Sequence, residues 1–139
     1  MAQQKINCTW KKGMAFESEI SGHRLIMDAV PTVGGNDEGP RPKPLVLASL
    51  AGCTGMDVVS ILRKMQQPFT YFNIEVDADS TEDHPKTYNA MKIIYEFKES
   101  DGLDPKKVEK AVQLSQERYC GVSALLKRAI PIDYEIRYI

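Results

Sequence analysis

The sequence predicts an α+β fold from three patterns. Apolar and polar residues alternate in short runs near both ends of the chain, which is typical of half-buried strands. A run without charges, from Leu45 to Met56, interrupts the alternation and indicates a long helix. Several proline and glycine residues, which interrupt regular secondary structure, precede this run, and Pro68 follows it. The resulting order of three strands, a helix, two strands, two helices and a strand favours a single α+β domain over residues 1–139.

Three short strands are predicted in the first thirty residues. The alternating positions are Ile6, Cys8 and Trp10, then Met14, Phe16, Ser18 and Ile20, then His23, Leu25, Met27 and Ala29. Turns are expected at Gly13 and Gly22, so an antiparallel meander is the simplest arrangement. Cys8 alternates inward with Ile6 and Trp10 in this arrangement, and we expect it to lie in the core.

A long loop and a long helix follow. Residues 31–44 carry four prolines and three glycines, and loops of that length are usually functional or mobile. The helix is expected from about Leu45 to Met65, because proline at position 68 disfavours helical geometry before it. An uncharged helix is apolar on every side and must be buried all round. Cys53, near the end of the apolar run, is therefore expected inside a core or at an interface between subunits.

Two strands, two helices and a closing strand complete the prediction. They are expected at 72–78, 91–97, 105–119, 120–128 and 130–138. The acidic stretch from Asp77 to Asp83 is expected to be a solvated hairpin connection. Asp104 as N-cap and Pro105 at the first helical position start the second helix. Leu103 and Val108 would staple its first turn.

Composition excludes several function classes. The 139 residues are 42% hydrophobic and 27% charged, and the net charge of −1 gives no electrostatic reason to expect nucleic acid as a partner. The first ten residues lack the apolar segment of a signal peptide, and the apolar run is shorter than the ~20 residues that span a bilayer. Three cysteines do not make a secreted disulfide framework. We therefore expect a cytoplasmic protein with reduced thiols and no membrane partner.

Two cysteines are candidates for chemistry. Gly52 and Gly55 flank Cys53, and two glycines in a helix suggest that another backbone or a substrate comes close. Cys120 starts a short apolar helix two residues after Arg118, and both features favour a lowered thiol pKa. Each thiol has an alternative interpretation as a buried hydrophobic residue without reactivity. Since ligand spacings such as HxxxH or CxxC and Gly-rich phosphate loops are absent, we expect neither a metal nor a cofactor.

The segments LASLAGCTGMDVVSIL and ERYCGVSALL, followed by an alternating strand, resemble the OsmC/Ohr family of osmotically inducible and organic hydroperoxide resistance proteins. The stretch GGNDEGPRPKP is similar to the YhfA-like branch of that family. The resemblance implies antiparallel sheets around a long buried central helix in an intertwined homodimer. It also implies a thiol peroxidase for organic hydroperoxides or hydrogen peroxide. Cys53 would be the peroxidatic cysteine and Cys120 the resolving one, and a dithiol of lipoyl type would restore both.

One departure from the family pattern keeps other functions open. Peroxidases of the family carry a glutamate before the first cysteine, paired with an arginine, whereas residues 42–44 here are Pro-Lys-Pro. Arg24, Arg41 and Arg118 are near by fold order, but none lies in the family's motif. The alternatives are a non-catalytic binding protein built on the same dimer and a redox sensor that uses a Cys53–Cys120 disulfide. Asp57, one turn after Cys53, disfavours a thiolate and favours these alternatives.

Overall fold

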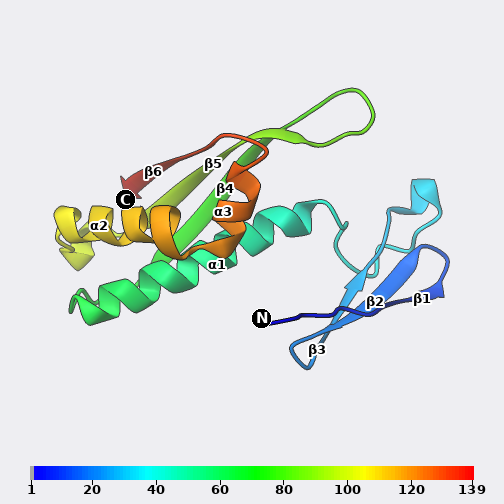
Figure 1. Cartoon of the computed structure of the whole chain (residues 1–139), viewed down its shortest axis with the longest axis horizontal. Helices are drawn as coiled ribbons and strands as arrows, with labels where there is room; N and C mark the ends of the chain where they lie inside the picture. Colours follow the sequence, from blue (N-terminus) through cyan, green and yellow to red (C-terminus); the bar gives the residue numbers. More distant parts are fainter. Residues whose placement is uncertain (1) are drawn as a thin grey trace. The chain divides into compact units, whose positions relative to one another are not determined.

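The computed structural model describes residues 2–139 and confirms the α+β fold class. The chain divides into two compact units that meet in sequence at Val46 and Leu47, and each is described by itself. The helices and strands are β1 (Cys8–Lys12), β2 (Ala15–Ile20), β3 (His23–Met27), α1 (Pro44–Lys64), β4 (Phe72–Ser80), β5 (Tyr88–Phe97), α2 (Pro105–Leu114), α3 (Gly121–Lys127) and β6 (Ile132–Tyr138) (Figure 1). Every predicted strand and helix is present. A single-domain organisation stays a prediction.

The smaller unit is the predicted antiparallel meander, with β2 between β1 and β3. Its interior is small, since Ala15 and Ser18 are the only residues of the three strands that are fully buried. The prediction that Cys8 lies in the core is wrong, because its side chain is exposed and Trp10 beside it is 60% exposed. Alternation indicated a strand correctly, but β1 is exposed along its whole length, so the alternation did not identify a buried side chain.

The loop after β3 is packed tightly against that strand. The buried carboxylate of Asp28 accepts hydrogen bonds from the backbone N–H groups of Ala29, Asn36 and Glu38 at 2.7, 3.1 and 3.2 Å. These donors, Ala29 first, hold the pKa of Asp28 below its usual range. A Cβ atom at Gly35 would lie 1.9 Å from the Ala29 carbonyl oxygen, so only glycine allows this approach.

The larger unit places helices on one face of a three-stranded sheet (Figure 1). Strand β5 is central; it pairs antiparallel with β4 and parallel with β6, so the sheet is mixed rather than purely antiparallel as expected. The buried side of β5 packs in one cluster with α1 and α2. This cluster contains Met91, Ile93, Tyr95 and Phe97 of β5, Leu50, Val58 and Leu62 of α1, and Val108, Ala111 and Val112 of α2. Full burial of such an apolar side chain stabilises the fold by about 1.5–3 kcal/mol.

Helix α1 is buried on one side only, which corrects the expectation of burial all round. Val58 is fully buried, whereas Met56 is 76% exposed. A Cβ atom at Gly55 would lie 2.9 Å from Ile74 Cδ1, so this glycine admits a side chain of β4, but Gly52 faces open space.

The 21 residues of α1 also meet the length and composition test for a membrane span, which the apolar run alone is too short to meet. Core helices of soluble proteins pass the same test, so it is weak evidence.

The segment after β5 confirms the predicted caps and adds a feature that was not expected. Asp104 Oδ1 accepts the Lys106 N–H at 3.0 Å as the N-cap of α2, and Leu103 and Val108 are both buried. The chain then forms a π-helical turn over Ser115–Tyr119 before α3 begins. Turns of this kind are rare and occur frequently at functional sites.

Candidate functional site

The fold brings Cys53 and Cys120 together although 67 positions separate them. Cys53 lies in the middle of α1 and is half-buried, whereas Cys120 is the N-cap of α3 and is buried. Cys53 packs against the buried cluster that contains Cys120, and its side chain is one of the groups that shift the Cys120 pKa. The exposed Cys8 belongs to the other unit. The pair is therefore arranged so that small molecules reach Cys53 more easily than Cys120.

The acidity of Cys120 differs from the sequence prediction. Burial raises its pKa to about 11, and the neighbouring Cys53 and the negative charge of Asp57 act in the same direction. The Ser123 N–H, which donates to Cys120 Sγ at 3.4 Å, lowers the pKa only in part. The prediction of a lowered Cys120 pKa is therefore wrong; Arg118 is not among the groups that shift this pKa, and its guanidinium lies over the Tyr119 ring at 5.7 Å. Desolvation outweighs the helix N-terminus, and Cys120 is a thiol at neutral pH.

A buried hydrogen-bond network lies beside the two thiols, and Thr54 is its centre. Thr54 Oγ1 is 2.7 Å from Tyr95 OH and 2.7 Å from Ser115 Oγ. Gln116 Nε2 donates to Thr54 Oγ1 at 3.2 Å and to Tyr95 OH at 2.9 Å. Ser123 Oγ donates to Gln116 Oε1 at 2.8 Å. The network joins α1, β5, the π-helical turn and α3.

Asp57 ends this network at its solvent side. Ser115 Oγ donates to Asp57 Oδ2 at 2.9 Å. The prediction that Asp57 disfavours a thiolate was made for Cys53 and stays a prediction there, whereas the charge of Asp57 does raise the pKa of Cys120. Burial raises the pKa of Tyr95 to about 12, so its hydroxyl stays protonated throughout the neutral range.

The network members were not predicted from the sequence. Thr54, Ser115, Gln116 and Ser123 are ordinary polar residues in helical segments, and Tyr95 alternates like any strand residue. The available signal was the position of polar residues on faces expected to be buried. Each of these side chains is buried in the structure, and buried polar groups need hydrogen-bond partners. Polar residues on the predicted core face of the helices would have pointed to the site.

The arginines considered from the sequence have other partners. Arg24 pairs with Glu17, and Arg41 pairs with Asp37 and donates to the Gly39 carbonyl at 2.8 Å. Both pairs lie within the smaller unit. No side-chain cation contacts Cys53 among the interactions described for residues 2–139.

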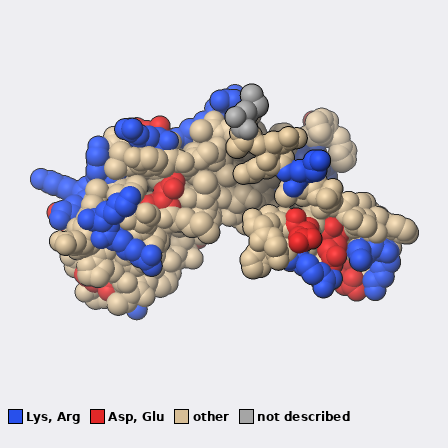
Figure 2. Space-filling view, turned by 60° about the horizontal axis from the view of Figure 1, so that its bottom comes forward, with Lys and Arg blue, Asp and Glu red and all other residues tan. Residues whose placement is uncertain are grey.

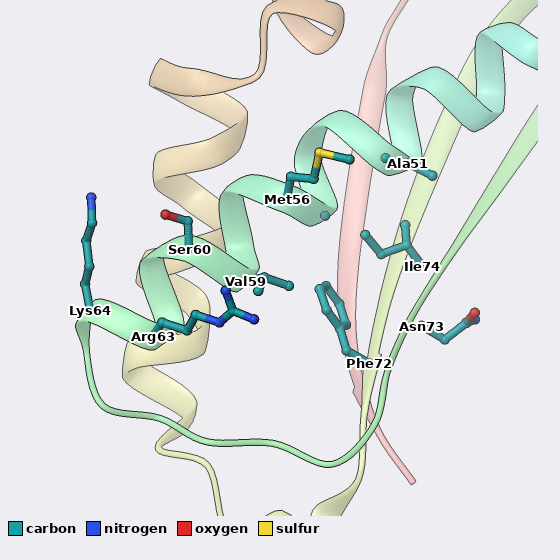
Figure 3. A pocket seen from close by; sticks show the side chains of 11 residues that line it. Ala51, Met56, Val59, Ser60, Arg63, Lys64, Phe72, Asn73 and Ile74 are labelled. Atoms are coloured by element: carbon teal, nitrogen blue, oxygen red, sulfur yellow. The ribbon is translucent and has the colours of Figure 1, made fainter. Parts of the chain in front are cut away.

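An apolar groove runs along the exposed side of α1 and the neighbouring strand β4. It has a volume of about 710 Å³, and Met56, Val59, Phe72 and Ile74 line it (Figure 3). Arg63 and Lys64, in the last turn of α1, lie at one end. The groove therefore combines an apolar wall with positive charge at one end.

The surface charges are mixed. On the face shown in Figure 2, Lys and Arg are scattered among Asp and Glu and separated by wide neutral areas. Among residues 2–139, no group of three or more His, Cys, Asp and Glu side chains is placed to hold a metal ion. The candidate chemistry of this chain therefore rests on the thiol pair.

Comparison with known proteins identifies the family. Residues 34–135 match the family described as OsmC-like protein. Protein YhfA of Escherichia coli K12 is 32% identical over 130 residues, which cover 91% of this chain and 93% of that protein. A hypothetical protein from Aquifex aeolicus has a similar structure, with a TM-score of 0.82 and 27% identity over 100% of this chain and 99% of that chain.

A more distant structure carries a functional name. It is an organic hydroperoxide resistance protein from Legionella pneumophila, with a TM-score of 0.66 over 99% of this chain and 98% of that chain. At 14% identity this likeness shows the shared fold alone. The family match and the relative at 32% identity decide the assignment. The chain belongs to the OsmC-like protein family, which confirms the resemblance found in its sequence.

Proposed function

We propose that this protein is a two-cysteine thiol peroxidase that reduces organic hydroperoxides or hydrogen peroxide. The observation that carries the proposal is that Cys53 lies close enough to Cys120 to shift its pKa. A peroxide-reducing cycle needs one thiol to be oxidised and a second to resolve the product. Two proteins that share the fold are named for organic hydroperoxide resistance, which agrees with the proposed substrate class.

The environment of the two sulfurs supports one assignment of roles. Cys120 is buried and is a thiol at neutral pH, because its pKa is raised to about 11. Cys53 is half-buried, and the Cys120 thiol can donate its hydrogen bond to the Cys53 sulfur. A donated hydrogen bond stabilises negative charge on the acceptor. Cys53 is therefore the nucleophile and Cys120 the resolving residue.

The reaction has three steps. The Cys53 thiolate attacks the distal peroxide oxygen, the O–O bond breaks, and the alkoxide leaves as an alcohol after taking a proton. Cys53 is then a sulfenic acid, and the Cys120 sulfur attacks it. The S–S bond forms, the S–O bond breaks, and the Cys120 proton leaves with the hydroxide as water. A dithiol, for which we propose a lipoyl type in a reducing cytoplasm, exchanges with the disulfide and restores both thiols.

Steady-state turnover tests this function. The reduced protein should consume cumene hydroperoxide in the presence of dihydrolipoamide, and Cys53→Ser should abolish consumption. Cys120→Ser should retain a single round of Cys53 oxidation and lose dithiol-dependent turnover. Cys8→Ser is the matched control, because this exposed thiol lies outside the pair. Equal turnover by Cys53→Ser and the wild type would overturn the proposal.

We also propose a homodimer in which the groove beside α1 receives the same helix of a second copy. Met56 is 76% exposed on the apolar side of α1 that lines the groove, and a soluble protein rarely leaves such an apolar surface uncovered. The family resemblance implies the same arrangement. Sedimentation should give a dimer, and Met56→Glu should shift the equilibrium toward monomer. A wild-type monomer at high micromolar concentration would exclude this assembly.

A redox switch is the second candidate, and one observation favours it. Arg24 and Arg41 are engaged with Glu17 and Asp37 within the smaller unit, so no arginine is assigned to the activation of Cys53. A switch would form the Cys53–Cys120 disulfide once and turn over slowly. Turnover with dihydrolipoamide separates the two functions, because only a peroxidase consumes many equivalents of peroxide per protein.

A further inference from the structure

The buried network beside the thiols has a single hydrogen-bond direction. Asp57 carries a carboxylate and can only accept, so the one Ser115 hydroxyl proton is directed to it at 2.9 Å. Ser115 Oγ must then accept from Thr54 at 2.7 Å. Thr54 has no further proton to donate, so Tyr95 OH donates to it at 2.7 Å.

Gln116 completes the network without an unsatisfied group. Its two Nε2 protons go to Thr54 Oγ1 and Tyr95 OH, and its Oε1 accepts from Ser123 Oγ. Its backbone carbonyl accepts from Lys127 Nζ at 3.0 Å. Fully satisfied buried networks of this kind rigidify a structure and specify one arrangement. The hydrogen bonds therefore form a continuous series of donors and acceptors, with Ser123 as the first donor and Asp57 as the final acceptor.

Two members of the network, Ser115 and Ser123, hydrogen-bond to Cys120 through their backbone groups. The Cys120 backbone N–H donates to the Ser115 carbonyl at 2.8 Å, which closes the π-helical turn. The Ser123 N–H donates to the Cys120 sulfur at 3.4 Å. Ser115 and Ser123 are both members of the network through their hydroxyls. Thr54, its centre, directly follows Cys53 in α1.

We propose that the hydrogen-bond chain from Ser123 to Asp57, centred on Thr54, positions Cys120 for disulfide formation with Cys53. This inference rests on the proposed two-cysteine function and extends it. The network governs the second step, in which the Cys120 sulfur must reach a disulfide geometry with Cα atoms within about 7 Å. Small displacements of a reacting group cost up to about 10²-fold in rate. Thr54, Ser115, Gln116 and Ser123 are positioning residues, since none of them reacts.

Thr54→Val tests the inference, because valine keeps the shape and removes the central hydroxyl. The reduced full-length protein is mixed with one equivalent of cumene hydroperoxide and quenched over time. Mass spectrometry then measures Cys53 sulfenic acid, trapped with dimedone, and the Cys53–Cys120 disulfide. We expect the ratio of the disulfide-forming rate to the Cys53 oxidation rate to fall by about tenfold or more. Sulfenic acid should accumulate in this variant.

Three further variants keep the test decisive. Thr54→Ser restores the hydroxyl and should restore the ratio. Thr70→Val is the matched control, because it also removes a threonine hydroxyl. This hydroxyl donates to Asp101 Oδ1 at 2.8 Å and is not part of the network beside the thiols. Ser123→Ala removes the first donor of the hydrogen-bond network and should also lower the ratio. This variant replaces Thr54→Val in the test if Thr54→Val does not fold. An unchanged ratio in every folded network variant overturns the inference.

A parallel oxidation with diamide separates this inference from the proposed function. Diamide accepts two electrons and two protons from a thiol pair and needs no peroxide chemistry. If peroxide leaves wild-type Cys53 unoxidised while diamide forms the disulfide, the peroxidase proposal fails and the network is assessed from the diamide rates. If Thr54→Val forms the disulfide at the wild-type rate with both oxidants, the positioning inference fails and the peroxidase proposal stands.

Discussion

The two sheets of this protein share a sequence pattern but not a packing environment. Both are built from strands in which apolar and polar residues alternate. In the larger unit, helices cover the apolar side of β5, and Phe97 is fully buried. In the smaller unit, Trp10 and Phe16 are 60% and 40% exposed. Alternation therefore predicts a strand and its two faces, whereas coverage of a face depends on what packs against it.

The largest expected difference between the sheets is in core stability. Phe97 stacks on Phe72 with ring centroids 4.4 Å apart, and Phe97→Ala should lower the free energy of unfolding by about 3–5 kcal/mol. Phe16→Ala, at a comparable ring on the exposed sheet, should lower it by about 1 kcal/mol or less. Urea denaturation followed by far-UV circular dichroism measures both. Equal losses would mean that the smaller sheet is covered in solution, and the loss would then depend on protein concentration.

The second prediction concerns alkaline pH, where the larger unit should unfold before the smaller one. The pKa values of Tyr95 and Cys120 are raised to about 12 and about 11, mainly by burial, from 10.0 and 9.0. The folded chain holds protons that the unfolded chain releases, so this stability is complete below pH 9 and declines as pH rises toward 12.

Intrinsic probes separate the two units in that experiment. Trp10 is the only tryptophan and lies in the smaller unit, whereas all six tyrosines lie in the larger one. Near-UV circular dichroism of the tyrosines should therefore change at lower pH than the fluorescence of Trp10. Loss of the tryptophan signal first would contradict the assignment of alkaline sensitivity.

The third prediction concerns acid pH and the loop of the smaller unit. Three backbone donors, Ala29 first, lower the pKa of Asp28 from 3.8. This contribution is present above pH 3.8 and is lost as pH falls through the folded value. Asp28→Ala should accelerate amide hydrogen exchange at Asn36 and Glu38, measured by NMR. Glu38→Gln, which removes a charge but none of these acceptors, should leave the exchange rate of Asn36 unchanged.

The smallest expected effect is at the surface of the exposed sheet. Arg24 pairs with Glu17 across β2 and β3, and the guanidinium side chain is 71% exposed. Exposed ion pairs contribute little because water and salt screen them. Arg24→Met should leave the melting temperature within about 1 °C of the wild type. A clear loss would indicate that the pair is covered in the assembled protein.

Local signals in the sequence account for most of the correct predictions. The Asp104-Pro105 start of α2, the end of α1 before Pro68 and the alternation of β4 to β6 all depend on neighbouring residues. The pairing of Cys53 with Cys120 came from a family resemblance, since nothing in their spacing implies contact. Three of the incorrect predictions concern burial: Cys8 in the core, α1 buried on every side and a lowered pKa for Cys120.

The sequence by itself determined the order and type of the helices and strands, because propensities, caps and periodicity act within a few residues. Tertiary structure alone decided which faces are covered and which polar side chains meet. Thr54 and Ser115 lie 61 positions apart and are joined at 2.7 Å only after α1 packs beside the π-helical turn. Burial and hydrogen bonding are properties of the surroundings of a side chain, and only the folded chain supplies them.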